Sequence, residues 1–257
     1  MNHYLESLFS LQGKIAVVTG GGRGLGKGMA VGLAGAGAEV ALVSRTEKEL
    51  KETVAEIRAK GGKADAYPAD ISKLNQIPDL VQAIHQKKGR IDILVNNAGF
   101  IIRKMALDYS PEDWERQLDV NLKAAFFMAQ AVAKFMKEQG GGKIINTLSL
   151  TSFIGLQNAP GYGISRGGLL SMTRTLAMEW AKYHIHVNAV APGYFKTNQT
   201  APLFADEKRV EWMLSRIPLA RAGVPDDLAG VAIFLASPAS DYMTGQAIVV
   251  DGGWLAG

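Results

Sequence analysis

The stretch Lys14–Gly26, KIAVVTGGGRGLG, places a cluster of glycines directly after a short apolar run. We predict a buried strand over Lys14–Thr19, because the run is short and apolar, and a helix over residues 24–36, where Met29 and Leu33 recur on one face. Glycines at such a junction let the backbone approach a pyrophosphate, and the helix N-terminus offers N–H groups with a partial positive charge. The stretch therefore favours a nucleotide-binding turn over an ordinary one, although its Gly-x-x-x-Gly-x-Gly spacing differs from G-x-G-x-x-G.

The rest of the chain continues this alternation of short strands and longer helices. Further strands are predicted at Glu39–Ser44, Lys63–Ala69, Asp92–Asn96, Lys143–Leu148, Ile185–Val190 and Gln246–Val250. Helices are predicted between them near residues 46–60, 74–88, 111–138, 161–183 and 225–236. Ser110 can cap the helix that begins at Pro111. The pattern predicts an α/β fold with a doubly wound parallel sheet, in one domain that spans residues 1–257.

Composition narrows the classes of protein that this chain can represent. Of 257 residues 47% are hydrophobic and none is cysteine, which excludes a disulfide framework and thiolate metal sites. Of its four histidines, His184 and His186 form a pair two residues apart without a carboxylate partner nearby in sequence, so no metal site is expected. No apolar run is long enough to span a membrane, and the extension over residues 1–12 does not resemble a secretion signal, so the cytoplasm is the expected location. The net charge of +4 slightly favours anionic ligands, but the cations are too dispersed to favour nucleic acid.

Two arginines suggest which nucleotide the glycine cluster accepts. Ser44 ends the second predicted strand and Arg45 follows it, while Arg23 lies within the glycine cluster. A carboxylate at the strand end would hydrogen-bond a ribose 2′-hydroxyl. Two cations without a carboxylate favour a phosphorylated ribose, so NADP is the expected cofactor and NAD the alternative. In a second interpretation, Arg45 is a solvated residue that opens the helix over Thr46–Lys60.

A set of polar side chains with acid/base potential follows the strand predicted at Lys143–Leu148. Ser149 comes directly after that strand, Tyr162 lies thirteen residues further on, and Arg166 lies four residues beyond on the same helix face. A hydroxyl, a phenol and a fixed cation in this arrangement could protonate or deprotonate a carbonyl oxygen. The neighbouring hydroxyls at positions 151 and 152 suit the same turn, so the assignment of Ser149 depends on the other motifs.

Several motifs together resemble the short-chain dehydrogenase/reductase family over essentially the whole chain. They are TGGGRGLG (19–26), Asp70, NNAG (96–99), Asn121, Ser149, Tyr162 and APG-x-x-x-T (Ala191–Thr197). The resemblance implies a seven-stranded Rossmann sheet and an assembly that is usually a tetramer or a dimer, with a homotetramer expected here. It also implies a cofactor site formed by Gly20, Gly22, Arg23, Gly24, Leu25, Gly26, Ser44, Arg45, Asp70, Ile71, Asn97, Ala98, Gly99, Tyr162, Arg166, Pro192, Gly193 and Thr197.

The same resemblance assigns individual roles to a few of these residues. Asp70 would contact the adenine, Asn97 and Gly99 would line the adenosine side, and Thr197 would hold the nicotinamide carboxamide. A second set would be catalytic, with a water held by Asn121, the substrate oxygen oriented by Ser149, and the proton carried by Tyr162. Arg166 departs from the family motif Y-x-x-x-K, in which a lysine binds the nicotinamide ribose and supports the phenolate.

An arginine at position 166 changes the chemistry that this motif can perform. Its guanidinium is permanently charged and offers several donors, so it can hold a ribose and support a phenolate. It is bulkier than an ammonium group and cannot release a proton, which calls into question any relay that runs through it. We expect reduced but real activity. The alternative is a catalytically impaired protein that only binds the nucleotide.

Other cations mark candidate contacts to the substrate. Arg103 and Lys104 follow the strand predicted at Asp92–Asn96, where a cation pair could hold a carboxylate or simply belong to a solvated loop. Tyr194–Pro218 interrupts the strand–helix alternation and is predicted to be a lid, within which Lys196 is a further candidate.

Four segments resemble the branch of the family that acts on sugar acids, namely residues 25–40, 101–104, 216–237 and 241–257. That branch includes gluconate 5-dehydrogenases and the 2-deoxygluconate and 2-dehydro-3-deoxygluconate dehydrogenases. It implies reversible hydride transfer at a secondary alcohol of a sugar acid, within carbohydrate metabolism. Reduction of a 3-oxoacyl thioester or a cyclic ketone remains an alternative on the same machinery.

Overall fold

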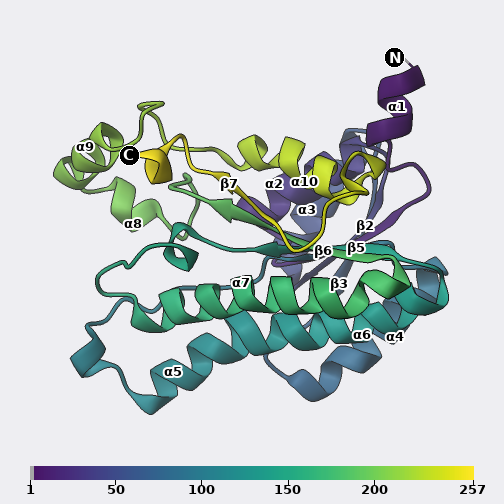
Figure 1. Cartoon of the computed structure of the whole chain (residues 1–257), viewed down its shortest axis with the longest axis horizontal. Helices are drawn as coiled ribbons and strands as arrows, with labels where there is room; N and C mark the ends of the chain where they lie inside the picture. The colour runs from purple at the N-terminus through teal and green to yellow at the C-terminus, as the bar shows by residue number, and fades with distance from the viewer. Residues whose placement is uncertain (1–2) are drawn as a thin grey trace.

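The computed structural model describes residues 3–257 and contains one seven-stranded sheet (Figure 1). The strands are β1 (Ile15–Thr19), β2 (Glu39–Ser44), β3 (Lys63–Pro68), β4 (Ile93–Asn96), β5 (Gly142–Thr147), β6 (Ile185–Pro192) and β7 (Ala247–Val250). All are parallel, in the order β3-β2-β1-β4-β5-β6-β7. The order reverses between β1 and β4, and a ligand crevice is expected at the carboxyl ends of the strands there. The predicted doubly wound sheet and its seven strands are confirmed.

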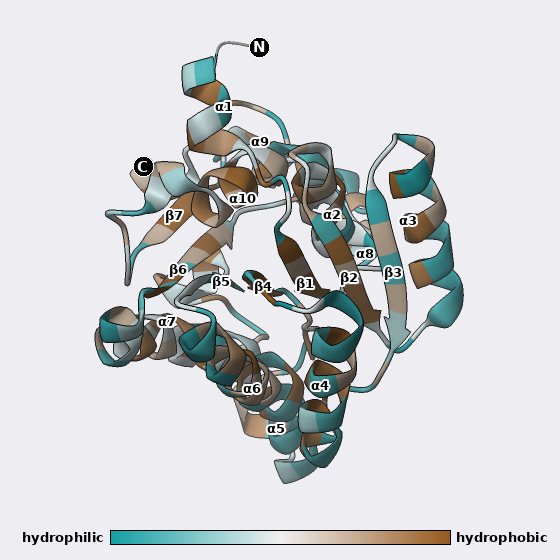
Figure 2. Ribbon diagram, turned by 90° about the vertical axis from the view of Figure 1, so that its right-hand side faces the viewer, coloured by the Kyte–Doolittle hydropathy of each residue, from teal (hydrophilic) through white to brown (hydrophobic). Residues whose placement is uncertain are grey.

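Helices cover both faces of this sheet (Figure 2). They are α1 (His3–Phe9), α2 (Gly24–Gly35), α3 (Glu47–Ala59), α4 (Ile77–Lys88), α5 (Pro111–Leu118), α6 (Ala124–Glu138), α7 (Pro160–Trp180), α8 (Ala201–Phe204), α9 (Glu207–Ser215) and α10 (Ala229–Ala236). One layer holds α2, α3 and α10, and the opposite layer holds α4, α6 and α7. No helix within residues 3–257 is long and apolar enough to cross a membrane.

The core divides into two apolar layers because successive side chains of a strand point to opposite faces. Val18 of β1 belongs to the layer with Leu33 of α2, whereas Val17 belongs to the layer with Met128 of α6. All five residues of β1 are buried, which explains why its sequence is continuously apolar rather than alternating.

The long helix predicted over residues 111–138 is interrupted by a π-helical segment. Ser110 caps α5 as expected, since its Oγ accepts a hydrogen bond from Asp113 N at 3.1 Å. After α5 the chain forms the π-helix Asp119–Lys123 before it continues as α6. A π-helical turn contains one extra residue, and such turns are frequent at functional sites. Asn121 lies inside this turn.

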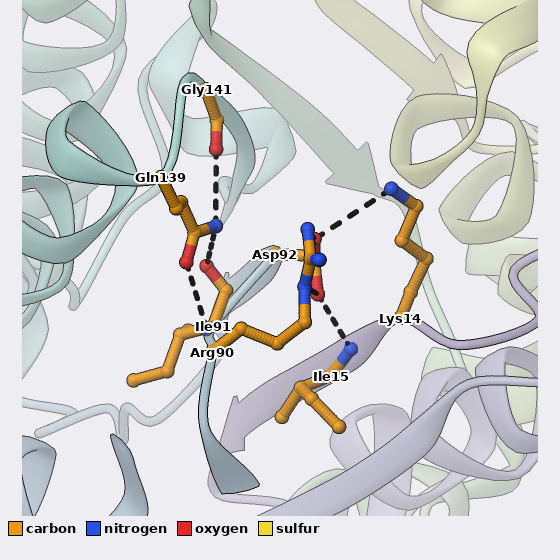
Figure 3. A network of polar contacts seen from close by, with 7 residues as sticks. All are labelled: Lys14, Ile15, Arg90, Ile91, Asp92, Gln139 and Gly141. Atoms are coloured by element: carbon orange, nitrogen blue, oxygen red, sulfur yellow. Dashed lines mark hydrogen bonds and ion pairs between the residues drawn. The ribbon is translucent and has the colours of Figure 1, made fainter. Parts of the chain in front are cut away.

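A polar network fixes β1 against β4 at the amino ends of the strands (Figure 3). The buried Asp92 carboxylate accepts hydrogen bonds from Ile15 N at 2.9 Å and from Arg90 Nε at 2.8 Å. Gln139 donates to Ile91 O at 2.7 Å, which ties the end of α6 to the same segment. These bonds satisfy backbone groups that would otherwise be buried without partners. The network is at the end of the sheet opposite the crevice, so its role is structural.

The N-terminal extension and the segment expected to be a lid both contain helices that the sequence did not indicate. Within the extension, α1 buries no residue, whereas Leu11 is fully buried in the core. Residues 1 and 2 lie outside the described part of the chain. Within Tyr194–Pro218, α8 and α9 enclose a small apolar cluster that includes Met213 and Trp254.

Candidate active site

The turn between β1 and α2 has a backbone conformation that favours glycine at two positions. Gly20 and Gly24 have φ angles of +65° and +55°, in the left-handed region that disfavours other residues. A Cβ atom on Gly26 would overlap the Gly20 carbonyl oxygen and the Asn97 side-chain amide. The chain therefore passes close to itself here, and the first N–H groups of α2 lie at the crevice. Such an arrangement suits a phosphate group.

Hydrogen bonds from Thr19 join this turn to the segment that follows β4. Thr19 Oγ1 accepts from Asn97 N at 3.0 Å and from Ala98 N at 3.1 Å, and it donates to Val95 O at 3.3 Å. Asn97 Nδ2 donates to Thr19 O at 3.1 Å. Thr19 was not among the residues expected at the site. Its signal was its position, as the last residue of a strand just before the glycines.

One cleft of about 780 Å³ runs across the carboxyl ends of the strands. Among the residues expected to bind the cofactor or substrate, those that line it are Gly20, Gly22, Arg23, Gly24, Leu25, Ser44, Arg45, Asp70, Ile71, Asn97, Ala98, Gly99, Ser149, Tyr162, Arg166, Pro192, Gly193 and Thr197. Gly26 lies behind this surface and acts through the close packing of the turn. The structure thus brings together segments that are far apart in the sequence.

The adenosine end of the cleft carries more charge than the sequence suggested. Ser44 Oγ is buried there without a hydrogen-bond partner, beside the exposed Arg45. Burial raises the pKa of Asp70, but hydrogen bonds from Ser72 and the charge of Arg45 outweigh it and hold the pKa below its usual value. Arg23 Nη1 lies 3.1 Å from Oε1 of Glu49, which also lines the cleft. The expectation of two cations without a carboxylate is therefore incomplete.

Ser149 and Tyr162 both line this cleft. Ser149 follows β5 by two residues, and its Oγ accepts a hydrogen bond from Thr151 N at 3.3 Å. Tyr162 lies in the first turn of α7, which has Pro160 at its first position. Ser152 Oγ donates to Arg166 O at 2.9 Å and so ties the segment after β5 to α7. These contacts place a hydroxyl and a phenol at the same wall of the cleft.

Arg166 is buried, with only 4% of its surface exposed, and is held from several sides. Its Nη1 donates to Thr147 O at 2.7 Å, and its Cζ lies 5.2 Å from the centroid of the Tyr162 ring. A Cβ atom on Gly99 would overlap Nη2, so this glycine gives the guanidinium its space. Nε is buried without a partner. The cation thus lies over the ring of the phenol, at the edge of the cleft.

Asn121 does not line the cleft but supports one of its edges. It is fully buried, and its side-chain amide accepts from Phe100 N at 3.0 Å and donates to Phe100 O at 2.9 Å. Gln117, also fully buried, donates to the same carbonyl and accepts from Ile102 N at 2.9 Å. Gln117 was not expected at the site, although its spacing of four residues from Asn121 places both amides on one helix face.

The three cations expected near the substrate do not line the cleft. Lys104 Nζ lies 2.6 Å from Asp113 Oδ2, and this hydrogen bond raises the pKa of the lysine above its usual range. Lys196 Nζ lies 5.8 Å from the centroid of the Phe204 ring. Arg103 is exposed, and its charge acts on Tyr194 at the start of the expected lid.

The arrangement fits a bound dinucleotide. The glycine turn leaves room for a pyrophosphate at the α2 N-terminus, and the unpartnered Ser44 Oγ and Arg166 Nε lie toward opposite ends of the cleft. A parallel sheet with this cleft and an adjacent hydroxyl, phenol and cation defines a class of nucleotide-dependent oxidoreductases. A family model described as enoyl-(acyl carrier protein) reductase matches residues 20–255. The chain belongs to the short-chain dehydrogenase/reductase family.

Relatives of this chain extend over nearly its whole length. The 2-dehydro-3-deoxy-D-gluconate 5-dehydrogenase of Escherichia coli (strain K12) is 50% identical over 251 residues, which are 97% of this chain and 98% of that protein. The gluconate 5-dehydrogenase of Gluconobacter oxydans (strain 621H) is 39% identical over 98% of both proteins. A crystal structure of gluconate 5-dehydrogenase from Burkholderia cenocepacia J2315 in complex with NADP and tartrate is similar with a TM-score of 0.95 and 38% identity, over 98% of this chain and 99% of that one. These similarities confirm the resemblance to the family and to its sugar-acid branch.

Proposed function

We propose that this chain interconverts a secondary alcohol and a ketone on a sugar acid, with NADP as the preferred cofactor. The observation that carries the proposal is a dinucleotide cleft that presents Ser149, Tyr162 and Arg166 together. The substrate class is supported by the relatives, which are named as gluconate and 2-dehydro-3-deoxy-D-gluconate dehydrogenases.

Each polar side chain of the cleft has a distinct role in this reaction. When bound, the nicotinamide cofactor donates or accepts the hydride. Tyr162 donates a proton to the substrate oxygen during reduction and removes it during oxidation. Ser149 hydrogen-bonds to that oxygen, an interaction that is stronger in a site poor in water. The charge of Arg166 favours the phenolate, while Asn121 keeps the Phe100 edge in place and holds a water behind the cleft.

The preference for NADP is supported by Ser44 and Arg45 at the end of β2. The buried Ser44 hydroxyl lacks a partner, and Arg45 offers a permanent positive charge beside it. A solved relative contains NADP, and NAD remains the alternative cofactor. The other cofactor-binding residues named above contact the nucleotide through the glycine turn and the segments after β3, β4 and β6.

The carboxylate of the substrate is proposed to bind just outside the cleft lining, between the loop after β4, which carries Arg103, and the predicted lid over Tyr194–Pro218. Lys104 N donates to Asn158 O at 3.0 Å, which joins the loop after β4 to the loop before α7. Because the Lys104 ammonium already pairs with Asp113, Arg103 is the better candidate of the two, and Lys196 approaches from the lid. The tartrate in a solved relative shows a hydroxy-acid in the presence of NADP in that protein.

A homotetramer in the cytoplasm is the proposed assembly and location. Apolar side chains are exposed on neighbouring helices, with Phe127 of α6 at 37% exposure and Ile164 and Met178 of α7 at 50% and 82%. Strand β7 also ends the sheet with an unpaired edge. Multi-angle light scattering on the purified protein should give four times the monomer mass. A dimer mass would restrict the contacts to one of these surfaces.

A substrate panel tests the proposed activity. The protein is mixed with NADPH or NADH and 5-ketogluconate, 2-dehydro-3-deoxygluconate, a 3-oxoacyl thioester or a cyclic ketone, and nicotinamide absorbance is followed. We expect turnover on a keto sugar acid with NADPH. Turnover on the thioester or the cyclic ketone alone would move the function to a different carbonyl. Nucleotide binding without any turnover would favour a protein that Arg166 has impaired.

A further inference from the structure

At the adenosine end of the cleft, Glu49 forms an ion pair with Arg23, which is one of the two arginines expected to bind phosphate. Glu49 Oε1 lies 3.1 Å from Arg23 Nη1, and both residues line the cleft together with Ser44 and Arg45. The Glu49 side chain is 27% exposed and that of Arg23 is 63% exposed, so the ion pair lies at the solvent-exposed rim of the cleft, where a bound nucleotide can reach it.

The fold holds Glu49 at this position. Thr53 lies one turn further along α3, is fully buried, and donates from Oγ1 to Gly22 O at 2.9 Å. A Cβ atom on Gly22 would lie only 3.1 Å from the Cβ of Glu49, so the glycine turn packs directly on the helix. The first turns of α3 and the glycine turn thus form one unit, and the Glu49 carboxylate stays next to any group bound there.

At this end of the cleft, each of the two arginines lies near an acidic residue. Arg23 pairs with Glu49, and the charge of Arg45 acts on Asp70 and helps to lower the pKa of that carboxyl. A phosphate monoester carries close to two negative charges at neutral pH. A ribose 2′-phosphate that binds Arg23 must therefore take it from Glu49 and remain close to that carboxylate, whereas a ribose 2′-hydroxyl meets neither cost.

We propose that Glu49 sets the cofactor preference by competing with the 2′-phosphate for Arg23. This competition reduces the difference in affinity between NADP and NAD, so that the protein can use either cofactor. The inference rests on the proposed function only in that a nicotinamide dinucleotide binds this cleft. Glu49 is a specificity-determining residue in this account, and it takes no part in hydride or proton transfer.

Binding of the oxidised nucleotides, measured by isothermal titration calorimetry, tests this directly. We expect Glu49→Gln to tighten NADP⁺ binding by about 3- to 10-fold, because one negative charge beside the phosphate is removed. The dissociation constant for NAD⁺ should change by less than about twofold, since its adenosine ribose carries no phosphate. The ratio of the two constants is the readout, and a merely structural effect would move both constants together.

Glu47 provides a matched control on the same helix. It pairs with Lys51, is 57% exposed and does not line the cleft. Glu47→Gln removes the same charge two residues away, and we expect it to leave the ratio unchanged. If both variants changed the ratio of dissociation constants equally, the effect would come from the overall negative charge of α3. That result would overturn the proposed competition between Glu49 and the 2′-phosphate.

A double-mutant cycle with Arg23→Gln tests the route of the effect. Arg23→Gln should weaken NADP⁺ binding, and Glu49→Gln in that background should improve it by less than about twofold, because the contested cation is gone. A full gain in the absence of Arg23, or an unchanged NADP⁺ to NAD⁺ ratio in the single variant, would overturn the inference. Failure of the unmodified protein to bind either nucleotide would overturn the proposed function instead.

Discussion

Tyr162 is the residue on which the proposed chemistry depends most. Its phenol faces the cleft beside Ser149, while its ring packs under the guanidinium of Arg166. We predict that Tyr162→Phe lowers kcat by about 100- to 10,000-fold, the range that a positioned acid/base group contributes. Nucleotide affinity should stay within about twofold, because the ring and its contact with the cation remain. Retention of more than about a tenth of the rate would contradict the assigned role.

Arg166 differs from the motif lysine in both size and proton chemistry. Arg166→Lys replaces a guanidinium fixed by Thr147 O with a compact ammonium that can take part in proton transfer. We predict a rise in kcat of about 3- to 10-fold, provided that the family motif describes the better catalyst. Stopped-flow measurement of the reduction step gives the rate.

Arg174→Lys, on the exposed face of the same helix, is the matched control and should leave kcat unchanged. No gain from Arg166→Lys would mean that the guanidinium serves as well as an ammonium at this position. In that case the donors of Arg166 and the space that Gly99 leaves next to Nη2 are sufficient for the reaction.

Helix α5 and the π-helical turn hold the loop after β4, which borders the proposed substrate site. Gln117 and Asn121 together satisfy the backbone of Phe100 and the amide of Ile102. We predict that Gln117→Ala lowers the free energy of unfolding by about 1 to 3 kcal/mol, because the partly buried Ile102 N loses its partner and Phe100 O keeps only the hydrogen bond from Asn121. It should also raise KM for the sugar acid more than KM for the nucleotide.

Urea unfolding and steady-state kinetics measure these two effects. Gln130→Ala, at an exposed position of α6, is the control and should change neither. An equal rise of both KM values would argue that the loop has no particular role toward the substrate.

The secondary structure was largely predictable because most helices and strands bury apolar side chains that recur at a regular spacing in the sequence. Strands of a covered parallel sheet are short apolar runs, and the predicted bounds of β2 coincide with those observed. The π-helical turn at Asn121 was not predictable. It adds one residue to a helix whose apolar pattern otherwise runs through residues 111–138, and the sequence shows no break there. The helices α8 and α9 were missed because their few apolar residues are shared with Trp254, which is distant in sequence.

The site residues that belong to local sequence motifs were predictable. Those whose contacts come from the packing of segments distant in sequence were not. The glycine turn, Ser149 and Tyr162 follow from local sequence and line the cleft. Glu49 reads as an ordinary acidic residue in the first turn of a helix, and only the packing of α3 on Gly22 reveals its contact with Arg23. The partner of Lys104 was hidden in the same way.

The stability of the folded chain should depend on pH in the acidic range through Asp227, whose hydrogen bonds stabilise the turn before α10. Hydrogen bonds from Arg221 at 2.7 and 2.9 Å and from Val224 N lower the pKa of Asp227 from 3.8 to about 2. A lowered pKa means that the contribution to stability is fully present above the pKa of the unfolded chain and is lost as the pH falls toward about 2.

Asp227→Asn should therefore lower the free energy of unfolding at neutral pH by about 1 kcal/mol or less, as expected for a pair near the surface. The difference between the variant and the unmodified protein should shrink as the pH is lowered through the region where Asp227 becomes protonated. Urea unfolding at a series of pH values measures it. A difference that is constant with pH would show that the stabilisation does not come from the ionised carboxyl.

In the proposed reaction, this chain transfers a hydride from NADPH to a ketone carbon of a sugar acid. A direct measurement uses NADPH that carries deuterium at both hydrogen positions of nicotinamide C4, together with 5-ketogluconate or 2-dehydro-3-deoxygluconate. We expect deuterium on the new carbinol carbon, as detected by nuclear magnetic resonance, and at most a trace of this product from the Tyr162→Phe variant in the same reaction time. Consumption of NADPH without deuterium at that carbon, or no transfer to either keto acid, would contradict the proposed reaction.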